Sequence, residues 1–357
     1  MPALLKPLLA GLAFLLASPA PVQTGPVSQA EFQAMLARVR GGGVLDLGKR
    51  RIDFGQPDFQ PVKPVTIRGG VFGPAYLNNW RNVTFDGAAF EGPPGTPDNQ
   101  FLFVAYGAQN VTLRNCRFTG HELPNGDLQV RGPSFRESSN VAIEHCLIEK
   151  MAGFSNFVRT AGARFADNEV RTVREGLEVV GGSNIVIERN RFEDFRPAEG
   201  DHPDAMQFFT TGLTRPGDTA SRGVVIRGNL VLGNSKAQGV FATDQIGMAA
   251  KGIGYRDFTI EDNVIVSATW HGITASEIEN VTVRNNRLYK RRGDPYDSRI
   301  GIDRSTGNVS VSDNDADDYV YAGPARQSGN RKHGPMDQAK LDAVVAEWMA
   351  RFRKPGA

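Results

Sequence analysis

The sequence contains little cysteine, almost no net charge and no long apolar segment after its first 20 residues. Its two cysteines, Cys116 and Cys146, have a spacing that suggests neither metal binding nor catalysis. Lys and Arg number 41 against 39 Asp and Glu, and this near balance gives no basis for bulk electrostatic binding of nucleic acid. Glycine is abundant, with 40 residues, and together with many Asn it fits a turn-rich β protein.

The first 25 residues have the layout of a secretory signal peptide. Lys6 precedes an apolar run at residues 8–17, and the small residues Ser18 and Ala20 follow it. The run is short for a membrane span, and an uncleaved anchor is the alternative. We therefore expect an exported protein, periplasmic or secreted, that has no membrane association after the signal is removed.

One short pattern recurs nine times along the chain. Seven clear copies begin with Asn or Asp and continue with alternating apolar residues, as in Asn110-Val-Thr-Leu-Arg114, and weaker copies begin at Gly162 and Gly223. The starts are 22 to 39 residues apart, so a core of roughly 22 residues carries insertions of variable length. The alternation predicts strands with one buried face, and the repeat predicts a coil of about nine stacked rungs.

A second column of residues lies six positions after each start. It contains Cys116, Cys146, Asn168, Asn190, Asn229, Asn263, Asn286 and Asn314. Stacked rungs are about 4.8 Å apart, so inward Asn side chains can bond to one another and to the backbone of the turns. The column predicts an asparagine ladder inside a parallel β-helix. For the two cysteines we expect buried thiols, and a disulfide between them is the alternative.

Helices are predicted at both ends of the coil. Ser28 and Glu31 form a capping-box pattern before apolar residues at helical spacing, and this helix should cover the N-terminal end. Residues 337–353 carry an apolar stripe that predicts an amphipathic helix folded onto the last rungs, with a partner-binding helix as the alternative. The chain then divides into a signal peptide (1–25), a β-helix with its N-terminal cap (26–335), and a C-terminal helix and tail (336–357).

Over residues 41–330 these features resemble the pectate-lyase-like superfamily of right-handed parallel β-helix proteins. The resemblance implies an all-β fold and a carbohydrate-type groove on one face. Many members of the superfamily are lyases, hydrolases or epimerases acting on uronic-acid polysaccharides, whereas others are phage spikes and adhesins. The fold alone therefore leaves the reaction open.

Each rung has another strand upstream of the repeated pattern, and the first and fourth residues of that strand should point outward. Stacking predicts a first outward column of Asn156, Glu175, Asp204, Gln238 and His271. It predicts a second outward column of Arg159, Glu178, Gln207, Phe241, Thr274 and Asp303. The longest insertions flank the same rungs, at residues 196–203, 211–222 and 244–256, so we predict a binding cleft there.

The centre of the predicted site is the string Gly200-Asp-His-Pro-Asp-Ala-Met-Gln207 together with His271. His271 and His202 are the candidate bases, since an imidazole titrates near neutrality, and Asp201 and Asp204 are their acidic partners. Two rung spacings place Asp204 and His271 roughly 10 Å apart at the backbone. The candidate substrate-binding residues around them are Gln207, Glu175, Glu178, Arg159, Arg174, Lys251, Phe241, Arg299 and Asp303.

The resemblance and these residues predict a lyase that cleaves a uronic-acid-containing polysaccharide by β-elimination. One alternative is a C5 epimerase or a glycoside hydrolase, the latter because Glu175 with Glu178, and Asp201 with Asp204, form acidic pairs. Another is a non-catalytic glycan-binding or adhesin-type protein that uses Phe241 and Trp270 as stacking platforms. Calcium stays open as a cofactor, because these carboxylates are hard oxygen ligands without the spacing of a known loop. We expect a monomer whose partner is an acidic polysaccharide.

Overall fold

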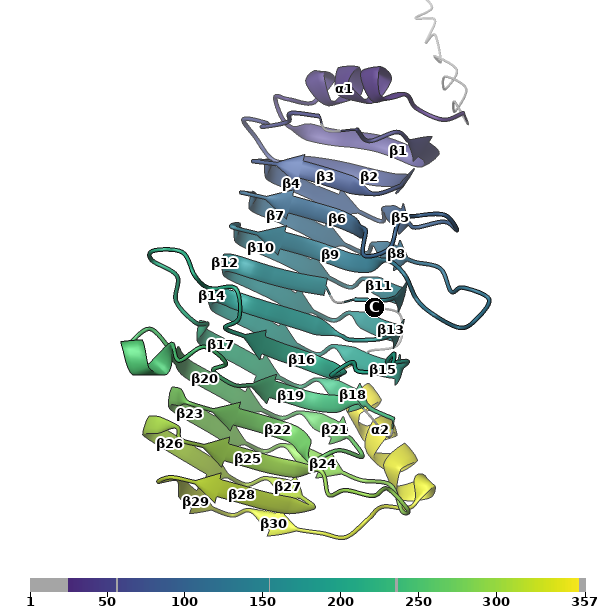
Figure 1. The fold of residues 1–357 in the computed structure, drawn as a ribbon. Coiled ribbons are helices and arrows are strands. Elements are labelled where there is room, and N and C mark those ends of the chain that lie inside the picture. The colour runs from purple at the N-terminus through teal and green to yellow at the C-terminus, as the bar shows by residue number, and fades with distance from the viewer. Residues whose placement is uncertain (1–24, 56, 154, 235–236, 353–357) are drawn as a thin grey trace, which may run out of the picture.

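The structure is a computed structural model that describes residues 25–352 apart from residues 56, 154 and 235–236. Nearly all of the predicted signal peptide lies outside the described residues. The named strands pair in parallel throughout and stack into three sheets around one apolar core (Figure 1). This arrangement confirms the predicted parallel β-helix.

The repeat sheet is formed by the strands of the repeated pattern. It contains β1 (Gly43–Ile52), β2 (Val65–Phe72), β4 (Arg81–Asp86), β7 (Gln109–Arg114), β10 (Ser139–Glu144), the second halves of β12 (Ser155–Ala166) and β14 (Leu177–Glu188), β17 (Arg222–Arg227), β20 (Tyr255–Glu261), β23 (Ile278–Arg284), β26 (Thr306–Ser312) and β29 (Arg326–Ser328). These twelve strands exceed the nine predicted rungs, because β1, β2 and β29 lack the repeated pattern.

The lateral sheet follows the repeat sheet in each rung. It contains β5 (Ala89–Glu91), β8 (Arg117–Thr119), β11 (Leu147–Met151), β13 (Glu169–Val173), β15 (Arg191–Phe195), β18 (Leu230–Leu232), β21 (Val264–Val266), β24 (Arg287–Tyr289), β27 (Asp315–Ala316) and β30 (Arg331–Lys332).

The site sheet carries both outward columns. It contains β3 (Ala75–Asn78), β6 (Phe101–Tyr106), β9 (Arg131–Arg136), the first halves of β12 and β14, β16 (Asp204–Phe209), β19 (Gln238–Ala242), β22 (His271–Ser276), β25 (Arg299–Asp303) and β28 (Asp318–Ala322). Within each rung the chain enters this sheet from the lateral sheet and leaves it for the repeat sheet. Loop 196–203 therefore precedes the site sheet, and loops 210–221 and 243–254 follow it.

The repeated Asn at the rung starts is explained by backbone geometry, except at Asn308, where the preceding Gly307 has the positive φ. Asn110, Asn184 and Asp257 have φ values of 55°, 55° and 59°, in the left-handed region that Gly, Asn and Asp tolerate best. Gly162 and Gly223 occupy the same position in the two weaker copies, with φ values of 65° and 63°. The start residues are therefore corners of the coil.

The predicted asparagine ladder is confirmed. Asn190 is fully buried, and its Nδ2 donates to the Phe165 carbonyl at 2.8 Å and to Asn229 Oδ1 at 3.0 Å. The same geometry repeats from Asn168 to Asn314, and Asn330 extends it by one rung. The ladder satisfies the carbonyl and amide groups that the turns bury.

The two cysteines continue the ladder column as free, buried thiols. The Cys116 amide donates to Cys146 Sγ at 3.3 Å, where an Asn oxygen accepts in later rungs. Burial raises the pKa of the Cys146 thiol. The prediction of buried thiols is confirmed, and the structure contains no disulfide between them.

Helix α1 (Gln29–Arg38) lies across the N-terminal end of the coil (Figure 1). Ser28 is its N-cap and accepts from the Glu31 amide at 3.3 Å, as the capping-box pattern predicts. The fully buried Phe32 packs its ring against Phe72 of β2, with centroids 6.2 Å apart. The helix thus covers apolar core that an open solenoid end would expose.

Helix α2 (Gln338–Phe352) packs along the lateral sheet beside β18, β21 and β24 (Figure 1). Leu341 and Trp348 are buried there, and Trp348 Nε1 donates to the Gly228 carbonyl at 2.8 Å. The prediction that this helix folds onto the coil is confirmed. Among the described residues, no helix has both the length and the apolar character needed to cross a membrane.

Candidate active site

Strand register defines the two outward columns of the site sheet. The first column contains Phe101, Arg131, Gly153, Glu175, Asp204, Gln238, His271 and Arg299. The second contains Val104, Ser134, Asn156, Glu178, Gln207, Phe241, Thr274 and Gly301. The predicted alignment of Asp204, Gln238 and His271 is confirmed.

Three of the predicted column positions are wrong. Asn156 pairs with Glu178, so it belongs to the second column and not the first. Arg159 lies at a corner with a φ of 48°, where its Nε donates to Asp218 at 2.7 Å and so holds loop 210–221 against the coil. Asp303 pairs with Ser276, because a register shift in the β22–β25 ladder places Gly301 in the second column.

The first and fourth residues of one rung meet above the sheet. His271 Nδ1 and Thr274 Oγ1, which occupy these two positions, are 2.7 Å apart. The Phe241 ring also contacts the His271 ring of the next rung, with centroids 5.1 Å apart. The two columns therefore form one continuous surface. Glu175, just before β14, and Glu178, on β14, are the first and fourth residues of their rung.

Three carboxyl groups on this surface have raised pKa values. Burial is the main cause for each, and it raises the pKa of Glu175 to about 7, of Glu178 to about 7 and of Asp204 to about 6. The negative charges of Asp201, Glu178 and Asp204 contribute further to the shift of Glu175. This carboxyl cluster of Glu175, Glu178 and Asp204 can hold protons near neutral pH, as an acid catalyst must.

His202 binds the buried Asp204 from the loop side. Its Nδ1 lies 2.8 Å from Asp204 Oδ2, and its Nε2 lies 3.1 Å from Gln238 Nε2 in the next rung. The bond to Asp204 raises the pKa of His202, and the bond from His202 lowers that of Asp204 against the effect of burial. Within the described residues, Asp204 Oδ1 is buried without a hydrogen-bond partner.

The two predicted histidine bases differ in their surroundings. Burial lowers the pKa of His271, and the charges of His202 and Arg299 lower it further. His271 is therefore neutral at neutral pH, whereas His202 is paired with a carboxylate. Their rings lie 6.4 Å apart, so the structure brings both predicted bases to one place.

Asp201 and Arg174 pair with each other. Arg174 Nε donates to Asp201 Oδ2 at 2.7 Å, and the Ala198 amide donates to the same oxygen at 2.7 Å. These bonds lower the pKa of Asp201 against the effect of burial. Asp201, which the sequence predicted to be catalytic, thus bonds to Arg174 and to the Ala198 amide and stabilises loop 196–203.

The remaining predicted residues lie further along the sheet or outside it. The Arg299 guanidinium lies 5.8 Å from the Trp270 ring centroid, and both line a pocket of about 240 Å³ that also includes Asp303. Gln207 lies between Glu178 and Phe241 in the second column. Lys251 ends the short 3₁₀ helix η1 (Ala249–Lys251) in loop 243–254 and is exposed, so the structure does not bring it to the carboxyl cluster.

Two parts of the site sheet were missed by the sequence prediction. Phe101, Arg131 and Arg136 lie on β6 and β9, N-terminal to the carboxyl cluster. Counting back nine residues from the rung starts Asn110 and Asn140 reaches Phe101 and Arg131 in the first column, as the same count from Asn184 reaches Glu175. That constant offset was a signal that could have found them.

The described part of the chain contains no cluster of side chains arranged to bind calcium. No group of three or more His, Cys, Asp or Glu side chains there is placed to hold a metal ion. Two of the acidic side chains are instead paired with cationic groups, Asp201 with Arg174 and Asp204 with His202.

The raised pKa values predict a stability that falls as the pH rises. Because Glu175, Glu178 and Asp204 have higher pKa values folded than unfolded, the native state binds more protons than the unfolded chain between about pH 4 and 7. The melting temperature should therefore decrease across this window. Glu178→Gln should flatten the decrease, measured by thermal unfolding at several pH values, and parallel curves for the two proteins would contradict the assignment.

Comparisons with known proteins agree with this fold. A family model described as the right handed beta helix region matches residues 62–200. No curated protein sequence matches the chain. The chain thus has the fold of a right-handed parallel β-helix, and its structural neighbours include both enzymes and adhesins.

Three solved structures illustrate that range. The surface adhesin PfbA of Streptococcus pneumoniae is 15% identical with a TM-score of 0.55, over 85% of this chain and 95% of that chain. The tailspike of E. coli bacteriophage HK620, solved with a pentasaccharide, is 11% identical with a TM-score of 0.58, over 86% of this chain and 63% of the tailspike. DFA-IIIase from Arthrobacter chlorophenolicus A6, solved with DFA-III, is 10% identical with a TM-score of 0.52, over 91% and 88% of the two chains. At these identities the likeness shows the fold alone.

Proposed function

We propose that the chain is an exported enzyme that hydrolyses a glycosidic bond of a polysaccharide laid along the site sheet. The observation that carries this proposal is the carboxyl cluster, in which the pKa values of Glu175 and Glu178 are about 7 and that of Asp204 is about 6. Glycoside hydrolysis needs one carboxyl that keeps its proton and another that is ionised. The cluster supplies both between these pKa values.

The neighbours of each carboxyl suggest its role. Asp204 has the lower pKa, and its bond with His202 favours the ionised form against the effect of burial, so we assign it the role of the ionised carboxylate. Glu175 is adjacent to Asp204 in the column, and burial, together with the negative charges of Asp201, Glu178 and Asp204, keeps the Glu175 proton in place. Glu175 is therefore the general acid that protonates the leaving oxygen. Glu178, between Asn156 and Gln207 in the second column, binds sugar hydroxyls.

β-Elimination, the reaction predicted from the sequence, is the second candidate. It is favoured by His271, whose pKa is lowered and which therefore offers a neutral imidazole as a base. Elimination also needs a cation at the sugar carboxylate. The cations that meet Glu175 and Asp204 are Arg174, which is paired with Asp201, and His202, so the centre of the cluster suits elimination less well than hydrolysis.

A substrate panel tests the reaction. The protein is incubated with alginate, pectate, glucuronan and neutral β-glucans, with calcium present or chelated, and products are measured as reducing ends and as ultraviolet absorbance. Hydrolysis gives new reducing ends without absorbance, whereas elimination gives both because each cut creates an unsaturated sugar. Unchanged polymers that are nonetheless retained on a polysaccharide gel would overturn the enzyme proposal in favour of an adhesin.

A further inference from the structure

A patch of arginine and aromatic side chains lies on the site sheet N-terminal to the carboxyl cluster. We call Phe101, Tyr106, Arg131 and Arg136 the Arg–Phe patch. The Arg131 and Arg136 guanidinium carbons lie 5.5 and 5.2 Å from the centroid of the Phe101 ring, and Arg136 lies 5.9 Å from that of Tyr106. The guanidinium groups of both arginines thus contact the Phe101 ring, on a surface that is otherwise rich in carboxylates.

Hydrogen bonds hold both arginines in place. Arg131 Nε and Nη2 donate to Asn99 Oδ1 at 3.2 and 3.0 Å, and Arg136 Nε donates to Ser134 Oγ at 3.1 Å. These contacts are to neutral oxygens. A guanidinium has five N–H donors in a planar fork, so the bond from Arg136 to Ser134 uses only one of its five. The patch is preorganised to present charge.

The patch is continuous with the carboxyl cluster. Arg131 is two positions before Glu175 in the first column, about 10 Å away at the backbone, and only Gly153 lies between them. A Cβ at Gly153 would lie 2.8 Å from Arg131 Cγ, so the arginine occupies the space above the glycine. The charges of Arg131 and Arg136 also lower the pKa of Glu178. A glycan that reaches Glu175 would also contact the patch.

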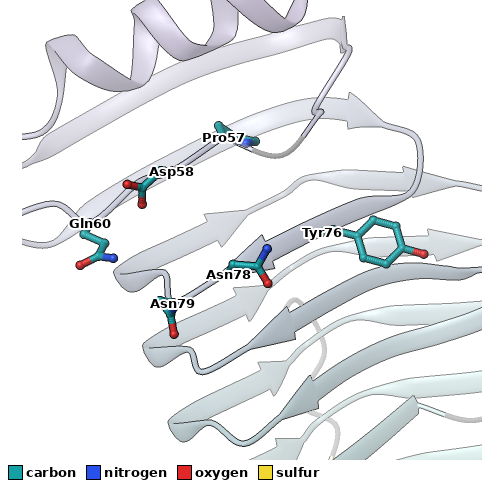
Figure 2. Close-up of a pocket in the computed structure, with 6 residues that line it drawn as sticks. All are labelled: Pro57, Asp58, Gln60, Tyr76, Asn78 and Asn79. Carbon is teal, nitrogen blue, oxygen red and sulfur yellow. The ribbon is translucent and has the colours of Figure 1, made fainter.

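The polar surface extends beyond the patch toward the N-terminus. Tyr76 and Asn78 of β3 pair in register with Val104 and Tyr106 of β6. Figure 2 shows both residues at a pocket of about 290 Å³ that Asp58 also lines. The site sheet therefore offers binding positions over several rungs on this side of the carboxyl cluster.

We infer that the Arg–Phe patch is a subsite for an anionic sugar unit, bearing a carboxylate or a sulfate, of the polysaccharide. The inference deepens the proposed function and rests on it. Arginine binds both anions through paired charge-assisted hydrogen bonds, and Phe101 offers a ring for a sugar face.

Binding of defined polymers to a Glu175→Gln background, which prevents their consumption, tests the subsite. The probes are polygalacturonate for carboxylate, dextran sulfate for sulfate and dextran as the neutral control, measured by affinity electrophoresis at low and high salt. At least one polyanion should bind, more weakly at high salt, and dextran should not. Arg131→Gln and Arg136→Gln should each weaken binding by about tenfold.

Arg68→Gln is the matched control, because Arg68 is an exposed arginine on the repeat sheet, 3.6 Å from Asp46. It should leave the affinity unchanged. Binding that is equal for dextran and the polyanions, or that survives the double replacement of Arg131 and Arg136, overturns the inference. If the protein binds polyanions through these arginines but cleaves no polymer, the result supports the subsite and refutes the proposed function. If the protein cleaves a glycan but its arginine variants bind the polyanions with unchanged affinity, the result supports the proposed function and refutes the subsite.

Discussion

Glu175→Gln should reduce kcat on the polymer that the panel identifies by about 10²- to 10⁴-fold, with little change in KM. Glutamine preserves the shape and hydrogen-bonding capacity of the side chain but cannot deliver a proton to the leaving oxygen. Asp204→Asn should cause a loss of similar size, because the amide cannot replace the carboxylate that His202 holds at 2.8 Å. Steady-state kinetics with the purified variants measures both effects.

The pH dependence distinguishes catalysis from a merely structural role. Wild-type activity should rise as Asp204 loses its proton near pH 6 and fall as Glu175 loses its proton near pH 7, which gives a narrow optimum between these values. Glu279→Gln is the matched control, since Glu279 is an exposed carboxylate that pairs with Arg256 on the repeat sheet, and it should leave kcat and the optimum unchanged. Full activity in either Glu175→Gln or Asp204→Asn would refute the assigned roles.

Much of the coil was predictable because its physics repeats in the sequence. A rung corner requires a left-handed residue, so Asn, Asp or Gly recurs at positions such as Asn184 and Gly223. The buried turn that follows requires an amide side chain, so Asn190 and Asn229 recur six residues later. Each requirement is met by few residue types at a regular spacing, so the repeat can be detected in a single sequence.

The outward columns were harder to predict because nothing in the core constrains outward side chains. The rung of Asn156 was misaligned by three residues, since the true first-column residue is Gly153, which has no side chain to mark the position. The rung of Asp303 was misaligned because β25 has one residue fewer than β22 directly after the pair His271 and Arg299, so Gly272 has no counterpart. The bond between His202 and Gln238 joins two rungs and depends on register that the sequence does not encode locally.

Asn229→Leu should lower the free energy of unfolding by about 4 kcal/mol, although leucine matches asparagine closely in size. Asn229 is fully buried, and its Oδ1 accepts from both the amide and the side chain of Asn190 at 3.0 Å. Its Nδ2 donates to the Ile187 carbonyl at 3.0 Å and to Asn263 Oδ1 at 2.9 Å. Leucine removes the partners of the Asn190 backbone amide, of one Asn190 side-chain N–H and of the Ile187 carbonyl, whereas Asn263 Oδ1 still accepts from the Asn229 amide. Each buried group left without a partner costs about 1–3 kcal/mol. Asn330→Leu, at the half-buried end of the ladder, should cost clearly less because water can replace its bonds. Urea unfolding followed by circular dichroism compares the two, and equal losses would show that the ladder does not stabilise the coil through its buried hydrogen bonds.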